Sequence, residues 1–327
     1  MRKTLIAVLL AGYSAFTWAG FDVVALGTQG GASGDNLTSY LIRTDGDARY
    51  IALDAGSVLT GIAKGVEKGS FPDVTAEKAA PLTPQGYVFR EQINAYFISH
   101  PHLDHVAGLV LGSPDDKKKT VYSLADSANT LHNHYFNWKS WPNFSDSGNG
   151  ERLGTYRINA PRVGQIFTLG TTSMRGVIYP LSHDGTVSSM LLIHSPRGES
   201  FAYFGDTGAD AQEKSKNLDA VWRVLGPLIQ QKSLKGMIIE TSYDNQQPDN
   251  KLFGHLTPKL LLSELMNLEK YSGGEGALKG FPVVVSHIKS TMVAGKDPLA
   301  LIQQQLSEGN SLGVNFIFMQ QGDKAEF

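Results

Sequence analysis

The sequence contains no cysteine, and this absence limits both how the fold can be stabilised and how it can bind metal. Without cysteine no disulfide can cross-link the chain, so a hydrophobic core must stabilise the fold by itself. Any zinc site must be built from histidine nitrogen and carboxylate oxygen. The N-terminal apolar run is followed by no cysteine, which excludes a lipid-anchored bacterial form.

The chain also lacks a large excess of charge. Its 327 residues are 41% hydrophobic and 18% charged, with a formal net charge of −2. A mildly acidic protein has no general electrostatic reason to bind nucleic acid, so we expect no nucleic-acid partner. The glycine-rich segment 27–34 lacks the Lys-Ser/Thr ending of a phosphate-binding P-loop, and we interpret it as a loop bordering a site.

Residues 1–19 are typical of a secretory signal peptide. A positive start, Met1-Arg2-Lys3, precedes the apolar run 5–12, which is too short to span a bilayer, and small residues then flank a cleavage triplet ending at Ala19. We expect cleavage after Ala19, a periplasmic location, a single mature domain over residues 20–327 and no membrane attachment. An uncleaved membrane anchor is the alternative. Nothing in the sequence indicates an oligomeric state.

Alternating apolar and polar segments predict a strand-rich α/β chain without repeats. The predicted strands include residues 21–27, 93–98, 236–240 and 281–285, a hairpin joins 39–43 to 50–53, and helices cover 218–231 and 258–268. Two further predictions concern residues 115–137. The charge run 115–119 predicts a solvated turn, and a helix is expected from Asp126 to Asn137.

The densest group of reactive residues follows the predicted strand 93–98. His100, His102, Asp104 and His105 occupy six consecutive positions, and imidazole and carboxylate groups are ligands that suit zinc and similar ions. In an extended loop His100 and His102 can hold one ion, while Asp104 and His105 hold a second. The alternative is a polar loop in which the histidines have no role.

Three other reactive residues directly follow predicted strands: His183, Asp206 and His287. Strand ends at one edge of a sheet can converge on one place, as ligand sites in sheet proteins commonly do. The sequence therefore predicts one metal site built from four strand ends.

These residues, in the order His-x-His-x-Asp-His and then His, Asp and His, resemble the metallo-β-lactamase superfamily. The resemblance extends from Asp54 to His287. It implies a four-layer αββα sandwich with a dinuclear metal site at one edge. It assigns His100, His102 and His183 to the first metal, Asp104, His105 and His287 to the second, and Asp206 to both. Asp54 would support the metal loop by hydrogen bonding.

The longer stretch from His100 to Pro114 is similar to the signature of class II cyclic-nucleotide phosphodiesterases, as are segments 35–39 and 254–258. This resemblance implies hydrolysis of 3′,5′-cyclic nucleotides to nucleoside 5′-monophosphates, with cAMP as the expected substrate, cGMP as a further candidate and no order of preference between them. The expected nucleophile is a hydroxide that bridges two divalent ions, with zinc as the expected metal. The cyclic nucleotide is the expected small-molecule partner.

Two residues are candidates for proton transfer. Asp104 would orient the nucleophile or carry its proton, and His255 would give a proton to the leaving oxygen or a hydrogen bond to a phosphoryl oxygen. Other residues are candidates for holding the base. The segment 132–144 contains five aromatic residues and predicts either a buried helix face or a wall against a planar ligand. The base-binding candidates are Asn36, Tyr135, Trp138 and Trp141.

Other functions share parts of this pattern. Many zinc β-lactamases use a cysteine ligand, which this chain lacks. Transfer-RNA 3′-processing nucleases share the metal motif and the histidine before threonine seen in His255-Leu256-Thr257, but pair that histidine with a glutamate at the position of Tyr203. An exported lactonase or arylsulfatase and a non-catalytic nucleotide-binding protein are further alternatives, although the latter usually lacks some of the ligands.

Overall fold

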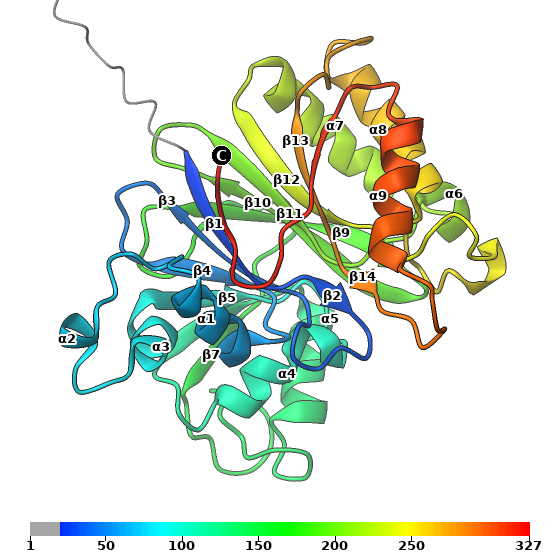
Figure 1. Cartoon of the computed structure of the whole chain (residues 1–327). Coiled ribbons are helices and arrows are strands. Elements are labelled where there is room, and N and C mark those ends of the chain that lie inside the picture. Colours follow the sequence, from blue (N-terminus) through cyan, green and yellow to red (C-terminus); the bar gives the residue numbers. More distant parts are fainter. Residues whose placement is uncertain (1–19) are drawn as a thin grey trace, which may run out of the picture.

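Two seven-stranded sheets lie at the centre of the protein (Figure 1). The computed structural model describes residues 20–327, so the predicted signal peptide lies outside the described residues. In spatial order the first sheet contains β16 (Lys324–Glu326), β1 (Phe21–Gly27), β3 (Ser39–Thr44), β4 (Tyr50–Leu53), β5 (Ile93–Phe97), β6 (Lys119–Tyr122) and β7 (Tyr156–Asn159). The second contains β15 (Asn315–Ile317), β13 (Pro282–Ser286), β12 (Leu234–Glu240), β11 (Ser200–Phe204), β10 (Thr186–His194), β9 (Arg175–His183) and β8 (Phe167–Thr168). A two-stranded ladder joins β2 (Gln29–Gly30) to β14 (Ile288–Lys289).

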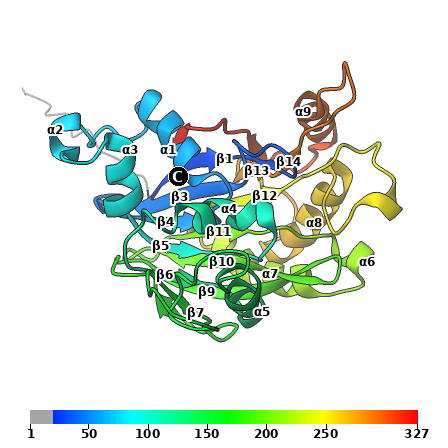
Figure 2. The same cartoon turned by 90° about the horizontal axis from the view of Figure 1, so that it is seen from below.

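Helices cover the outer face of each sheet (Figures 1 and 2). Beside the first sheet are α1 (Val58–Glu67), α2 (Ala76–Ala79), α3 (Pro84–Tyr87), α4 (Leu103–Gly112) and α5 (Ala125–Thr130), with π-helical turns at Val88–Gln92 and Leu131–Tyr135. Beside the second are α6 (Asp210–Glu213), α7 (Asn217–Gln230), α8 (Pro258–Tyr271) and α9 (Pro298–Gly309), with a 3₁₀ turn at Asp249–Lys251. None of the helices in residues 20–327 has the length and apolar character needed to cross a bilayer.

Three apolar clusters define the layers. The middle cluster lies between the sheets and joins Phe97 and Tyr40 of the first to Leu191 and Tyr203 of the second. One outer cluster packs α1 and α4 onto the first sheet, and the other packs α7, α8 and α9 onto the second. Burying apolar area in three layers is the main stabilising contribution in a chain without disulfides. The arrangement is an αββα sandwich, as predicted.

Most strong periodic patterns gave the correct element. β1 covers the predicted residues, β3 and β4 pair antiparallel as the predicted hairpin, and α7 and α8 lie where the apolar spacing indicated helices. α8 begins at Pro258, a residue whose fixed φ and missing N–H suit the first helical position. The predicted helix from Asp126 is shorter than expected, because α5 gives way to a π-helical turn that ends at Tyr135.

Two predictions about polar segments were wrong. The helix after the histidine cluster begins at Leu103, so Asp104 and His105 lie in its first turn and not in a loop. The charge run 115–119 is not simply a solvated turn. The side chains of Asp116 and Lys119 form an ion pair and are only 0% and 2% exposed. The hydroxyl groups of Tyr96 and Tyr156 donate hydrogen bonds to Asp116, which compensates its burial.

Candidate metal centre

The candidate metal ligands converge at one edge of the sandwich, as the strand ends predicted. His100 and His102 follow β5, and Asp104 and His105 form the first turn of α4. From the second sheet come His183, the last residue of β9, and His287, which directly follows β13. Asp206 lies two residues beyond β11. Ligands from both sheets therefore meet between the two halves of the fold.

Asp54 anchors the segment that carries the histidines. Its carboxylate accepts hydrogen bonds from the backbone N–H of Ser99 (2.7 Å), the Ser99 hydroxyl (2.7 Å), His105 Nδ1 (2.8 Å) and the Tyr203 hydroxyl (2.6 Å). The residue is fully buried and has a φ of +53°, an uncommon backbone conformation for a non-glycine residue. Asp54 thus fixes both the start of the metal loop and the ring of His105. Hydrogen bonds to the metal loop are what the resemblance implied for this residue.

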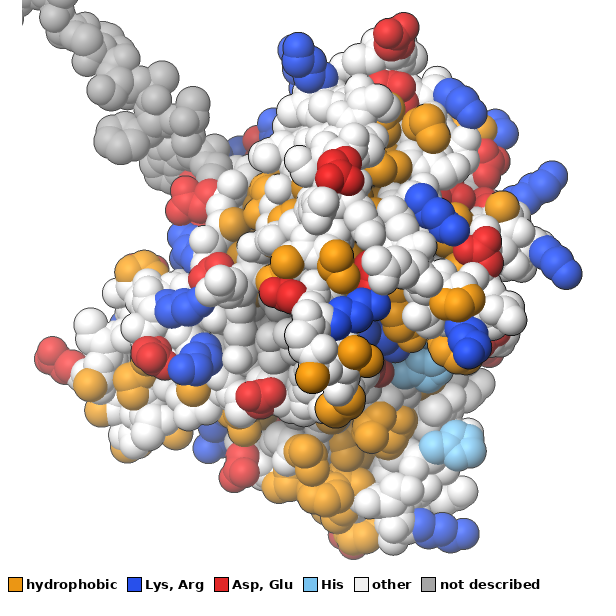
Figure 3. Space-filling model, turned by 45° about the vertical axis from the view of Figure 1, so that its right-hand side comes forward, with side chains coloured by type: hydrophobic (Ala, Val, Ile, Leu, Met, Phe, Trp, Pro, Cys, Tyr) orange, Lys and Arg blue, Asp and Glu red, His pale blue; other side chains and the backbone are white. Residues whose placement is uncertain are grey.

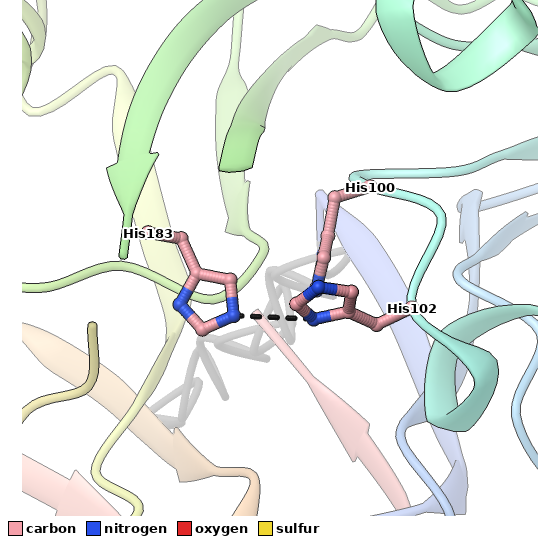
Figure 4. Close-up of side chains that lie close together, drawn as sticks. All are labelled: His100, His102 and His183. Carbon is pink, nitrogen blue, oxygen red and sulfur yellow. Dashed lines mark hydrogen bonds between the residues drawn. The ribbon is translucent and has the colours of Figure 1, made fainter. Parts of the chain in front are cut away.

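A first group brings together His100, His102 and His183 (Figure 4). One potential ligand atom from each lies within 4.8 Å of the others. His102 Nδ1 is 3.3 Å from His183 Nε2, and His102 Nε2 is 3.5 Å from the Thr186 hydroxyl. These are the three residues expected to hold the first metal.

A second group brings together Asp104, His105 and His287 within the same limit. Asp206 lies between the two groups. Its Oδ2 atom is 3.7 Å from His100 Nε2, 3.8 Å from His183 Nε2 and 3.1 Å from His287 Nε2, and its Oδ1 atom is 3.3 Å from His105 Nε2. Asp206 is therefore close to ligands of both groups, and its role as a bridge between two ions stays a prediction.

Hydrogen bonds hold four of the imidazoles with Nε2 directed to this centre. Nδ1 bonds to the Ser99 hydroxyl in His100 (3.0 Å), to Asp54 in His105 (2.8 Å), to the Gly254 carbonyl in His183 (2.8 Å) and to the Thr38 hydroxyl in His287 (2.7 Å). The Ser99 and Thr38 hydroxyls donate elsewhere, so they accept from the rings. Bonds of this kind set the tautomer of a metal-binding histidine.

The donor set fits divalent metal ions. The Nε2 atoms of His100, His105 and His287 are buried and have no hydrogen-bond partner in the described chain. Buried polar atoms are nearly always paired, so three unpaired nitrogens facing one carboxylate suit a bound cation. Five imidazoles and two carboxylates, without thiolate, are ligands suited to zinc and other borderline ions.

The electrostatics of the centre favour positive charge. Burial by itself raises the pKa of Asp206, but His105 and His287 beside it hold that pKa well below its usual value. Burial and the neighbouring imidazole of His105 lower the pKa of His100, which keeps its ring neutral. Burial opposes a proton on His105, yet Asp206 and Asp54 raise its pKa well above the usual value. The field that favours a proton there also favours a metal cation.

His255 lies beside the centre and pairs with a carboxylate that the sequence analysis missed. Its Nδ1 atom is 2.8 Å from Glu240 Oε1 and 3.8 Å from Asp206 Oδ2. Glu240 ends β12 and is 2% exposed. It also accepts hydrogen bonds from the Ser242 hydroxyl and the backbone N–H of Thr207. Burial raises the pKa of Glu240, but His255 outweighs this effect and lowers it.

Transfer-RNA 3′-processing nucleases carry the glutamate that pairs with this histidine at the position of Tyr203. Its hydroxyl binds Asp54 instead, and the glutamate comes from a different strand. Glu240 could have been found from the sequence, because it ends an apolar strand in the same way as the predicted ligands. A single glutamate at a strand end is common, however, so this position alone does not identify it.

A cavity of about 280 Å³ opens onto this centre. In Figure 3 recessed histidine surface is visible on this face between basic and hydrophobic side chains. The residues that line the cavity are His102, Asp104, His183, Asp184, Thr186, Asp206, Phe253, His255 and Lys289. The cavity therefore combines potential metal ligands, the His255 ring and one ammonium group.

The predicted base-binding residues lie outside the lining of this cavity. The Tyr135 hydroxyl donates to the Pro101 carbonyl, Trp141 Nε1 to the Ser113 hydroxyl and Trp138 Nε1 to the Glu151 carbonyl. Asn36 closes its own loop through Thr28 and borders a separate cavity of about 290 Å³. Contact of these four residues with substrate stays a prediction.

Comparisons with known proteins agree on one family. Residues 21–322 match the family described as class-II cAMP phosphodiesterases. A Yersinia pestis protein named "Probable 3′,5′-cyclic-nucleotide phosphodiesterase" is 58% identical over 327 residues, which cover 100% of this chain and 95% of that protein.

Two solved structures share the fold. The structure of unliganded yeast PDE1 superposes with a TM-score of 0.84 and 23% identity, covering 94% of this chain and 100% of that one. The metallo-β-lactamase fold protein YhfI from Bacillus subtilis gives a TM-score of 0.57 with 16% identity, covering 94% and 99%. The predicted metallo-β-lactamase type of sandwich is therefore confirmed.

Proposed function

The chain belongs to the class-II cAMP phosphodiesterase family and is a 3′,5′-cyclic-nucleotide phosphodiesterase, and we propose that it acts through a centre of two divalent metal ions. The products are nucleoside 5′-monophosphates, with cAMP as the proposed substrate and cGMP as a further candidate. Among the candidate ligand groups are His100, His102 and His183, and Asp104, His105 and His287, and the observation that carries the two-metal proposal is that the buried Asp206 lies close to histidines of both groups.

Zinc is the proposed metal, and the protein residues give the reason. His100, His102 and His183 would hold one ion, Asp104, His105 and His287 the other, and Asp206 both. When bound, two such ions supply a water of lowered pKa and positive charge that offsets the charge on the phosphoryl oxygens.

The chain's own residues place the substrate and move protons. Asp104 is held by a hydrogen bond from the backbone N–H of Gly31 (2.8 Å), and its lowered pKa keeps it ionised against the effect of burial because His105 and His287 lie close by. As a carboxylate it can accept a hydrogen bond from the attacking water. Lys289 adds a positive charge to the cavity that receives the phosphate.

We propose that His255 is the acid for the leaving group. As the attacking water oxygen forms a bond to phosphorus, the bond to the 3′ oxygen breaks, and that oxygen needs a proton. His255 can supply it, while Glu240 accepts a hydrogen bond from Nδ1 and fixes the ring. This pairing explains why a buried glutamate accepts four hydrogen bonds at this place.

The test is hydrolysis of cAMP by purified residues 20–327, with metal content measured on the same sample. We expect 5′-AMP, about two metal ions per chain and no turnover in His102→Ala. Glu240→Gln separates proton transfer from metal binding: it should keep both ions and lose turnover. Bound metal without cAMP hydrolysis would overturn the proposed substrate assignment. β-Lactams, lactones, sulfate esters and transfer-RNA precursors would then be assayed next. If the purified protein binds no metal, the proposal of a two-metal centre is wrong.

We further propose that the enzyme is exported to the periplasm. Support comes from the charged start, short apolar run and small-residue triplet of residues 1–19. Cell fractionation and N-terminal sequencing of the chain expressed in a Gram-negative host test this directly. The expected result is periplasmic protein beginning at Gly20, and cytoplasmic protein beginning at Met1 would contradict it.

A further inference from the structure

We propose that Phe253 is the stacking platform for the nucleobase of the substrate, and that it binds the base without selecting between adenine and guanine. This inference rests on the proposed cyclic-nucleotide substrate. It gives the phenylalanine a role in affinity, while the metal groups and His255 handle the phosphate.

Among residues 20–327, Phe253 is the only apolar residue that lines the cavity at the metal centre. All the other lining residues are polar or titratable. A cyclic nucleotide has two chemically different ends, an anionic phosphate and a flat base whose faces are poorly hydrated. The ligand groups, His255 and Lys289 suit the phosphate end, and Phe253 is the one apolar ring of the cavity lining that is left to cover the face of a base.

The side chain of Phe253 is exposed to solvent, and its backbone adopts an unfavourable conformation. Phe253 is 57% exposed, and among the phenylalanine and tryptophan residues of the described chain only Trp138 is also classed as exposed. Its φ of +52° is a true outlier for a bulky residue. Strained residues of this kind persist when their surroundings impose them and cluster at ligand sites.

The neighbours of Phe253 explain how it is kept in place. Leu252 and Leu256 are 4% and 0% exposed and anchor the segment in the core beside the second sheet. Gly254 lies against the metal group, because a Cβ atom there would be 2.5 Å from the Asp184 nitrogen and 2.7 Å from His183 Nδ1. With both sides fixed, Phe253 projects at a constant place relative to His183 and His255.

The chemistry of the ring predicts which substrates it helps. A phenyl ring has no hydrogen-bond donor or acceptor, so it can stack on any base but cannot read its edge. The expected gain in affinity is therefore similar for cAMP and cGMP. Loss of a stacking ring typically weakens binding by about ten- to one-hundredfold.

The experiment compares Phe253→Ala with the unaltered protein on three substrates: cAMP, cGMP and 1-deoxyribofuranose 3,5-cyclic phosphate, which has the cyclic phosphodiester but no base. We expect KM for cAMP and for cGMP to rise by at least about tenfold and by similar factors. Hydrolysis of the base-free compound and the metal content should stay unchanged. Phe253→Trp should retain low KM. Ile166→Ala removes an apolar side chain of equal exposure, 57%, and serves as the matched control.

Several outcomes would overturn the inference. Unchanged KM for both nucleotides in Phe253→Ala would do so, as would an equal loss on the base-free compound, which would indicate a structural effect through Gly254 and His183. A rise in KM for only one nucleotide would show that the residue selects the base. A rise in Trp138→Ala in place of Phe253→Ala would favour the sequence-based prediction. If the unaltered protein hydrolyses neither nucleotide, the proposed function itself fails.

Discussion

Asp54 shows how much of the centre depends on one residue that need not touch a metal ion. It links the metal loop, His105 and Tyr203 through four hydrogen bonds. Asp54→Asn keeps the shape but puts an amide where the His105 N–H and other donors require an acceptor. We expect a loss of about 10- to 100-fold in metal affinity or kcat/KM. Metal titration and cAMP hydrolysis measure this. Tyr203→Phe, which removes a single donor, should lose much less.

The histidine pKa values predict how the centre responds to acid. Burial and neighbouring imidazoles lower the pKa of His100 and His102 below the usual 6.5. A lowered pKa disfavours the charged form, so these rings stay neutral as the pH falls through 6.5 and remain able to bind metal. We expect at least half of the metal to be retained after dialysis at pH 6.5 and release only at lower pH. His134→Ala, which alters an exposed histidine, should behave identically. Half-release above pH 6.5 would contradict this.

At the same scale, single residues differ in how well the sequence predicted them. The structure brings together all seven predicted metal-binding side chains. They could be predicted because each is a strong ligand type directly after an apolar strand or within the His-x-His-x-Asp-His cluster. Glu240 and Phe253 were missed. Glutamate at a strand end and phenylalanine in a loop are common, and only the tertiary fold shows that one pairs with His255 and the other faces the cavity.

The β2–β14 ladder places the backbone of Gly30 in close contact with His287, a residue of the second metal group. A Cβ atom on Gly30 would lie 2.2 Å from His287 Nε2, so only glycine fits there. We expect Gly30→Ala to displace the ring, reduce bound metal towards one ion per chain and lower activity by at least about 100-fold. Gly34→Ala is the matched control in the same loop, since a Cβ atom there meets nothing within 4 Å. Equal activity of the two variants would contradict the expectation.

Elements with a strong apolar period were predicted well, and polar segments were not. The run from Asp115 to Lys119 looks like a solvated turn because five charged residues are rarely buried. The buried pair of Asp116 and Lys119 depends on two tyrosine hydroxyls and the Phe89 carbonyl, which come from distant parts of the chain. No local pattern contains those partners, so the burial could not be inferred from spacing.

At the scale of the whole molecule, the metal centre lies at the edge of a fold that has its own core. The three apolar clusters do not depend on the ligands, whereas the ligands come from both sheets. We expect chelation to abolish hydrolysis and leave the far-ultraviolet circular dichroism unchanged. Because bound ions stabilise only the folded state, Tm should fall by about 5 °C or more. Restored zinc should return both properties, and unfolding on chelation would contradict this.

The pairing of β1 with β16 has a consequence for the order in which the protein can fold. Phe21 and Phe327 exchange two backbone hydrogen bonds of 2.9 Å, so β1 gains its second neighbour from residues at least 300 positions away. Until those residues leave the ribosome, one edge of β1 stays open to other chains, which is a risk for aggregation. The first sheet is therefore completed only after residues 324–327 have been synthesised, and folding at that late stage is what the export proposed above would require.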